Sequence, residues 1–198
     1  MVKNSKLLGL VLAGGHSTRM GEDKGLMSYH GKPQRLYLLE ELKPFCDEVF
    51  LSIREDQEHE LGDNIPRIVD EDIYKGPFNG LLSAHHTFPE AALFVIACDL
   101  PMVSSSVLKY LYDHRNTESV ATAFATRESQ LPEPLAAIWE PTGLREAEIY
   151  LETAKSSCPR KFLINSQTTL VTPKDDLWVA NANVPSEYEA IRDKIYGR

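Results

Sequence analysis

The chain has 198 residues, of which 42% are hydrophobic and 25% are charged, and its formal net charge at pH 7 is −8. This length predicts one domain over residues 1–198 with a single core, and the acidic charge argues against a protein that binds nucleic acid, since such domains are usually basic. The three cysteines are far apart and have no metal-binding spacing, which is typical of a reducing compartment, so we predict a cytoplasmic location.

The first element is an apolar run that follows Lys3 and Lys6 and ends in glycines. We interpret residues 7–12 as a buried strand. The alternative is a secretion signal, but the run is short for the apolar part of a signal and the glycines are a poor cleavage context. No segment approaches the roughly 20 apolar residues that span a bilayer, so no membrane contact is expected.

Strand and helix patterns alternate along the rest of the chain. Helical spacing or capping residues predict helices at residues 34–45, 80–88, 104–115, 144–154 and 187–195. Apolar runs predict strands at residues 48–53, 67–69, 91–98, 120–126 and 135–139, the last as an antiparallel return. This alternation predicts an α/β fold, a doubly wound and mostly parallel sheet with helices on both faces. The polar segment 127–133 is predicted to be a loop over the site.

A glycine-rich, basic segment follows the first strand. Gly14 and Gly15 begin where the apolar residues stop, and Arg19 and Lys24 add two positive charges. Glycine lets backbone N–H groups approach a ligand closely, and a nest of such donors binds anions. The spacing is neither that of the common phosphate loop nor that of the dinucleotide fingerprint. We therefore predict a polyphosphate site, with a plain strand-to-helix turn as the alternative.

Two carboxylates also follow predicted strands. Asp70 comes after residues 67–69, and Asp99 comes after the central apolar run and is followed by Pro101. Ligands of α/β sheets bind beyond the carboxyl ends of strands, so Gly14, Asp70 and Asp99 are expected to share one site. Asp99 is the candidate Mg²⁺ ligand, because magnesium takes one or two carboxylates plus substrate phosphates. The alternatives are a helix cap or a turn for Asp99 and a solvated acidic run for Asp70.

Motifs along nearly the whole chain resemble those of the molybdenum cofactor guanylyltransferases, a family of the nucleotidyltransferase superfamily. In chain order they are Leu12-Ala13-Gly14-Gly15 with Ser17, Arg19, Met20, Gly21, Asp23 and Lys24; Asp70 with Gly76-Pro77-Phe78-Asn79-Gly80; Cys98-Asp99-Leu100-Pro101; Pro134-Leu135 with Ala137; and Asn181-Ala182-Asn183 with Pro185 and Glu187. The resemblance implies a single Rossmann-like nucleotidyltransferase domain.

The resemblance also implies an activity: GMP passes from Mg-GTP to the terminal phosphate of molybdopterin, and pyrophosphate leaves. The GTP site it implies consists of Leu12, Ala13, Gly14, Gly15, Arg19, Lys24, Asp70 and Asp99. Within that set Arg19, Lys24 and Asp99 are the implied catalytic residues, and Asp99 holds Mg²⁺. Asn181 and Asn183 are the implied molybdopterin contacts. Proteins that deliver and accept the cofactor are the implied macromolecular partners.

The chain departs from the family pattern at several positions. Residues 52–54 read Ser-Ile-Arg, where relatives often carry an Asn that touches the base, so the role of Arg54 stays open. Val184 replaces a Thr, and Glu133 stands where some relatives have His. His85 and His86 lack the i, i+4 spacing of a metal pair and are expected to be structural or exposed.

Other functions remain open from the sequence. A cytidylyltransferase of the same cofactor is the nearest alternative, although such enzymes tend to carry Ala where this chain has Gly14. A sugar-phosphate nucleotidyltransferase and a non-catalytic GTP- or pterin-binding partner are the others, and the presence of Asp99 favours an enzyme over the last. The sequence shows no recognisable Ser/His/Asp or Cys/His set for nucleophilic catalysis, which is consistent with direct in-line displacement.

Overall fold

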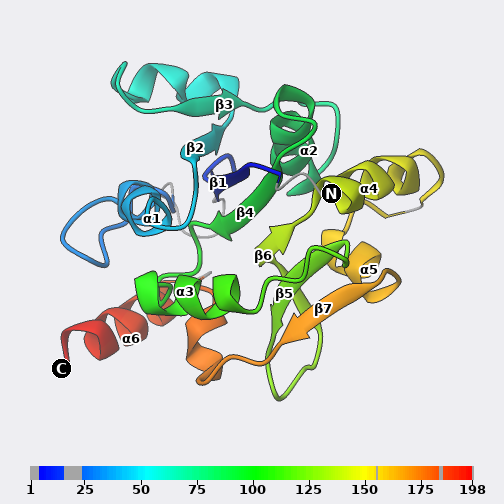
Figure 1. Ribbon diagram of the computed structural model, residues 1–198. Coiled ribbons are helices and arrows are strands. Elements are labelled where there is room, and N and C mark those ends of the chain that lie inside the picture. Colours follow the sequence, from blue (N-terminus) through cyan, green and yellow to red (C-terminus); the bar gives the residue numbers. More distant parts are fainter. Residues whose placement is uncertain (1–4, 16–23, 155, 183–184, 198) are drawn as a thin grey trace.

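A single seven-stranded sheet forms the centre of the molecule (Figure 1). The computed structural model describes residues 5–15, 24–154, 156–182 and 185–197, and the predictions for Arg19 and Asn183 lie outside these ranges. The strand order is β3-β2-β1-β4-β6-β5-β7. The predicted α/β class, with helices on both faces of a mostly parallel sheet, is confirmed.

Four parallel strands form one half of the sheet. Strand β1 (Leu7–Leu12) pairs with β2 (Glu48–Ile53) on one side and β4 (Ala92–Ala97) on the other, and β3 (Arg67–Val69) forms the edge beyond β2. All six residues of β4 are buried, as expected of a central strand covered on both faces. The carboxyl ends of β1, β3 and β4 therefore lie at one edge of the sheet.

The predicted antiparallel return is β6 (Pro132–Trp139), which pairs antiparallel with both β4 and β5 (Ala121–Ala125). Beyond β5 the sheet ends at β7 (Thr168–Val171), which is parallel to β5. The register between β5 and β6 shifts at Ala123/Phe124, so β6 is irregular near its start.

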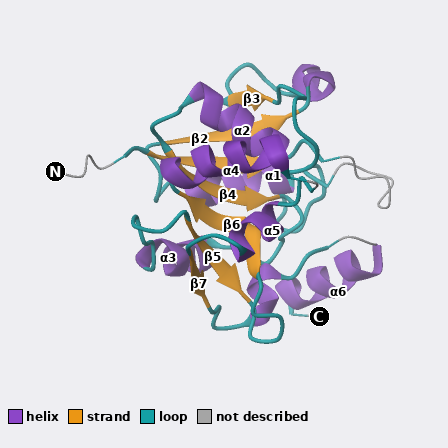
Figure 2. Ribbon diagram, turned by 90° about the vertical axis from the view of Figure 1, so that its right-hand side faces the viewer, coloured by secondary structure: helices purple, strands orange, loops and turns teal. Residues whose placement is uncertain are grey.

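Alternate residues of the strands supply two separate cores. Leu7 and Val11 of β1 pack with helices α1 (Gln34–Leu42) and α3 (Ser105–Asp113), whereas Leu8 and Leu10 pack on the other face. That second face is covered by α2 (Phe78–Thr87), α4 (Pro141–Thr153) and α5 (Pro159–Ile164). Figure 1 shows α1 and α3 on one side of the sheet and α2, α4 and α5 on the other, and Figure 2 views the sheet from the second side. The last helix, α6 (Pro185–Tyr196), packs through Ile191 on Tyr29.

The predicted strands at residues 7–12, 48–53 and 67–69 have the observed bounds, and the other predicted elements differ by a few residues at their ends. Four observed elements were not predicted: α5, β7 and two short 3₁₀ helices, η1 (Glu55–Glu60) and η2 (Asp176–Val179). Each of these is short, so periodicity does not reveal it.

The Ser104 side chain does not cap α3; instead, Glu41 of α1 accepts hydrogen bonds from the backbone N–H and the hydroxyl of Ser105. Residues 127–133 do not line the cavity described below, and Arg127 is bonded through its N–H to Asp176 and through its guanidinium to the Lys174 carbonyl. Within the described residues, no helix has the length and apolar character needed to cross a membrane.

Candidate active site

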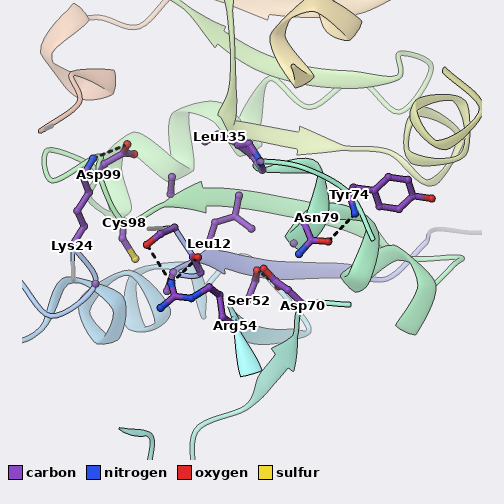
Figure 3. A pocket seen from close by; sticks show the side chains of 18 of the residues that line it. Leu12, Lys24, Ser52, Arg54, Asp70, Tyr74, Asn79, Cys98, Asp99 and Leu135 are labelled. Atoms are coloured by element: carbon purple, nitrogen blue, oxygen red, sulfur yellow. Dashed lines mark hydrogen bonds and ion pairs between the residues drawn. The ribbon is translucent and has the colours of Figure 1, made fainter. Parts of the chain in front are cut away.

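A cavity of about 500 Å³ opens at the carboxyl ends of β1, β3 and β4 (Figure 3). It brings together the three strand ends that the sequence predicted to meet, with Gly14, Asp70 and Asp99 all in its wall. Its lining residues are Leu12, Ala13, Gly14, Gly15, Lys24, Gly25, Ser52, Arg54, Asp70, Asp72, Tyr74, Lys75, Gly76, Pro77, Asn79, Gly80, Ala97, Cys98, Asp99 and Leu135.

Two side chains at the start of η1 hold the glycine turn after β1 in place. The Arg54 guanidinium donates to the Gly14 carbonyl over 2.9 Å, and the buried Gln57 side chain donates to the Ala13 carbonyl over 3.2 Å. The oxygen of Gln57 accepts from the Arg54 N–H at 3.0 Å. With these carbonyls bonded to protein donors, the turn has a fixed backbone, as a preformed anion site requires.

Gly14 stands against Asp70. A Cβ at Gly14 would lie 2.9 Å from Asp70 Oδ2, so a side chain there would displace the carboxylate. Gly80 on α2 is equally constrained: a Cβ there would collide with Ser52 Oγ and lie 3.4 Å from Asp70 Oδ1. Glycine at both positions lets β1 and α2 close around the carboxylate.

Asp70 is held by its neighbours and partly withdrawn from water. Ser52 Oγ donates to Asp70 Oδ1 over 2.7 Å, and the Arg54 charge acts on the same carboxylate. Burial raises the pKa of Asp70 from 3.8 to about 6, while hydrogen bonds from Ser52 and Asn79 and the charge of Arg54 oppose the rise. This carboxylate therefore has few water contacts and is suited to accepting hydrogen bonds from a ligand.

Asp99 and Lys24 form an ion pair at the opposite end of the cavity, with Lys24 Nζ 3.5 Å from Asp99 Oδ2 (Figure 3). Burial raises the pKa of Asp99, and the Lys24 charge works against that rise. The other oxygen, Asp99 Oδ1, is buried and has no hydrogen-bond partner among the described residues. An orphaned carboxylate oxygen beside an anion site fits a hard cation such as Mg²⁺.

That carboxylate would not hold a cation alone. Among the described residues, no group of three or more His, Cys, Asp or Glu side chains is arranged to bind a metal ion. Magnesium usually completes its shell with water and substrate phosphates. The site therefore fits a cation that arrives with a polyphosphate.

The far wall of the cavity comes from the segment between β3 and α2. Asn79 Oδ1 accepts from the Tyr74 N–H over 3.1 Å, and Asp72 and Gly76 have positive φ angles of 56° and 68°. Lys75 also lines the cavity. Gly76 and Asn79 belong to a motif found in the sequence, whereas Asp72, Tyr74 and Lys75 were not assigned to the site from the sequence.

Glu71 and His86 are bonded within the protein rather than directed into the cavity. Glu71 accepts from His86 Nδ1 over 2.6 Å, and His86 Nε2 donates to Glu148 over 2.9 Å. His85 is buried, and burial lowers its pKa. The expectation that both histidines are structural or exposed is confirmed.

The C-terminal segment reaches the site through its backbone. The Ala182 N–H donates to the Asp99 carbonyl over 2.9 Å. Asn181 is exposed and does not line the cavity. Glu133 is bonded to Arg160 of α5 and accepts from the Leu135 N–H over 3.2 Å, so it shapes β6 next to the lining residue Leu135.

The seven-stranded, mostly parallel sheet with its covering helices is a nucleotidyltransferase-like fold. The chain belongs to the MobA-like NTP transferase family, whose domain model matches residues 9–169.

Individual relatives and structures agree with this assignment. A molybdenum cofactor biosynthesis bifunctional protein of Synechocystis sp. is 34% identical over 191 residues, which are 96% of this chain, yet the chain spans only 55% of that protein. A molybdenum cofactor guanylyltransferase of Pseudomonas fluorescens (strain SBW25) is 30% identical over 180 residues, 89% of this chain and 88% of that protein. The crystal structure of molybdopterin-guanine dinucleotide biosynthesis protein A from Archaeoglobus fulgidus shares the fold: its TM-score is 0.76 at 22% identity, covering 96% of this chain and 100% of that one.

Proposed function

We propose that this chain transfers GMP from Mg-GTP to the terminal phosphate of molybdopterin. An oxygen of that phosphate attacks the α-phosphorus of GTP, the bond between the α-phosphorus and the bridging oxygen breaks, and pyrophosphate leaves. The products are the guanine dinucleotide form of the cofactor and pyrophosphate. The similar proteins named molybdenum cofactor guanylyltransferase support this assignment over the cytidylyl alternative.

The observation that carries the proposal is the separation of two half-buried carboxylates, Asp70 and Asp99, across one cavity. Asp70 lies beside the Gly14 turn, where it can accept from the N–H groups of a guanine edge. Asp99 lies beside Lys24, which suits the triphosphate. We therefore expect the purine to lie beside Asp70 and the phosphates to lie beside Asp99 and Lys24.

Each group then has a distinct task. Asp99, whose Oδ1 has no hydrogen-bond partner among the described residues, would hold Mg²⁺, and the cation would supply charge neutralisation at the phosphates. Lys24, together with Arg19 from outside the described residues, binds phosphate oxygens and stabilises the charge that the leaving pyrophosphate takes. The backbone N–H groups of Gly14 and Gly15 orient the nucleotide.

Molybdopterin contacts are proposed for Asn181 and Asn183. Because the Ala182 N–H is bonded to the Asp99 carbonyl, Asn181 is directly next to the loop that carries the metal ligand. We also propose that the reaction takes place in the cytoplasm, with proteins that deliver and accept the cofactor as partners.

Thermal unfolding with GTP, CTP or ATP, each with Mg²⁺, tests the nucleotide assignment. A ligand at 100 times its dissociation constant adds about 2.7 kcal/mol to the unfolding free energy, a rise of roughly 5 °C or more in Tm. We expect a GTP-selective rise that Lys24→Ala abolishes, followed by turnover with molybdopterin. A CTP-selective rise would replace the guanylyl assignment with the cytidylyl one.

A further inference from the structure

Three successive carbonyl oxygens of the Asp99 loop, residues 99–102, each accept a hydrogen bond from another part of the chain. The Ala182 N–H donates to Asp99 O over 2.9 Å. The Gln34 side-chain nitrogen donates to Leu100 O over 3.4 Å, and His30 Nε2 donates to Pro101 O over 2.8 Å. Two of these donors are side chains of residues 24–35, here called the Lys24 segment.

The Lys24 segment is built around the start of α1. The Gln34 N–H donates to Met27 O over 2.8 Å, and the Arg35 N–H donates to Gly25 O over 3.0 Å. The His30 ring stacks on Tyr37 of α1, with centroids 3.8 Å apart and planes 16° apart. The same backbone therefore fixes both the turn that carries Lys24 and the two side chains that hold the Asp99 loop.

The burial of Gln34 indicates that its side-chain N–H is needed as a hydrogen-bond donor to the Asp99 loop. Its side chain is fully buried, and its Oε1 has no hydrogen-bond partner among the described residues. Burying an unpaired amide oxygen is unfavourable, and an apolar side chain of similar length would avoid that cost. The hydrogen bond to the Leu100 carbonyl explains why an amide is present at position 34.

We propose that His30 and Gln34 are positioning residues, which hold the Asp99 loop against the Lys24 segment so that the Asp99 carboxylate and the Lys24 ammonium meet one metal–triphosphate group. The inference rests on the proposed function, because Mg-GTP is the ligand in question. Neither residue lines the cavity, so both act through Asp99 and Lys24.

Metal binding in the GTP complex tests this directly. Mn²⁺, used as the probe, is titrated into protein with GTP while the free ion is followed by electron paramagnetic resonance. We expect His30→Ala to weaken Mn²⁺ binding about tenfold, since small misplacements of a ligand group carry large penalties. GTP affinity without metal should change less than twofold, and His30→Gln, which keeps a donor near the Nε2 position, should restore most of the Mn²⁺ affinity.

His114→Ala is the matched control. This histidine also bonds a backbone carbonyl, that of Tyr110 at 2.7 Å, and it packs on the Tyr110 ring, but it follows α3 and does not line the cavity. We expect it to leave Mn²⁺ affinity unchanged. Gln34→Met, which removes the donor but fills the space, should weaken Mn²⁺ binding as His30→Ala does.

The outcomes separate the two proposals. If wild-type protein binds Mn²⁺ with GTP, and if His30→Ala and Gln34→Met match the His114→Ala control, the positioning role is overturned and the proposed function stands. If wild-type protein binds GTP with no Mn²⁺ at all, both are overturned. If His30→Ala fails to fold, the decision passes to Gln34→Met and His30→Gln.

Discussion

Ser52 lies in β2 and Asp70 directly follows the neighbouring strand β3, and the Ser52 hydroxyl donates to Asp70 Oδ1 over 2.7 Å. The bond leaves Oδ2 facing Gly14 and the cavity. Ser52 therefore determines which carboxylate oxygen is available to a ligand.

The first prediction concerns the pH dependence of GTP binding. The pKa of Asp70 is raised to about 6, so the carboxylate is ionised at pH 7.5 and protonated at pH 5. Since the ionised form is the better acceptor for guanine N–H groups, GTP affinity should fall as the pH drops through about 6. Ser52→Ala removes a bond that lowers this pKa, so the midpoint should move to higher pH. Calorimetric titration from pH 5 to 8 measures both.

Asp70→Asn is the control for that experiment. Ionisation of the GTP phosphates still affects binding to this variant, but position 70 has no carboxyl group to titrate. The fall in affinity near pH 6 should be absent or smaller in this variant. An unchanged profile would mean that Asp70 does not contact the base.

The second prediction separates binding from chemistry at Asp99. Asp99→Asn keeps the size of the side chain but weakens a charged ligand for Mg²⁺. GMP transfer should fall by about a hundredfold or more, since removing one transition-state interaction of this kind has such effects. GTP binding measured by calorimetry should survive. Transfer at the wild-type rate would exclude Asp99 as the metal ligand.

The third prediction concerns the glycine on α2. A methyl group at Gly80 would meet Ser52 Oγ and Leu12 Cδ2, so Gly80→Ala should lower the free energy of unfolding by about 1–3 kcal/mol. It should also abolish the GTP-dependent rise in Tm, because Ser52 and Asp70 must move. Gly62→Ala is the matched control, since a Cβ there meets nothing within 4 Å. Equal effects of the two substitutions would contradict the packing argument.

The fourth prediction concerns stability away from the site. Arg115 Nε and Nη2 donate to the two oxygens of Glu140 over 2.7 and 2.9 Å, and the Glu140 side chain is only 4% exposed. Glu140→Ala leaves a largely buried guanidinium without its partner, so the free energy of unfolding should fall by about 3–5 kcal/mol in urea denaturation. Asp113→Ala, which breaks an exposed pair with Lys109, should change it by less than about 1 kcal/mol.

The sequence predicted the centre of this molecule better than its periphery. Leu7–Leu12 and Glu48–Ile53 are buried strands whose apolar runs end at glycine or a charged residue, so their bounds were predictable. Thr168–Val171 is an edge strand with one buried residue, and α5 has only six residues, so neither has a distinct periodicity.

The same contrast holds at the site. Gly14, Asp70 and Asp99 were predictable because they follow strands, and Lys24 because it adds charge to the glycine-rich segment after β1; all four line the cavity. Gln57 was not, because it lies in an acidic stretch that looks solvated, and only the folded chain shows its amide between Ala13 and Arg54. His30 and Gln34 depend on contacts with residues about 70 positions away, which no local pattern contains.

The hydrogen bond from the Ala182 N–H to the Asp99 carbonyl has a consequence for synthesis of the chain. All seven strands are complete once residue 171 has left the ribosome, so the sheet can form before this donor exists. The loop that carries Asp99, the proposed metal ligand, gains this backbone contact only when the segment after η2 folds back. A nascent or truncated chain that stops short of Ala182 would thus have all seven strands but lack the hydrogen bond that holds the Asp99 loop.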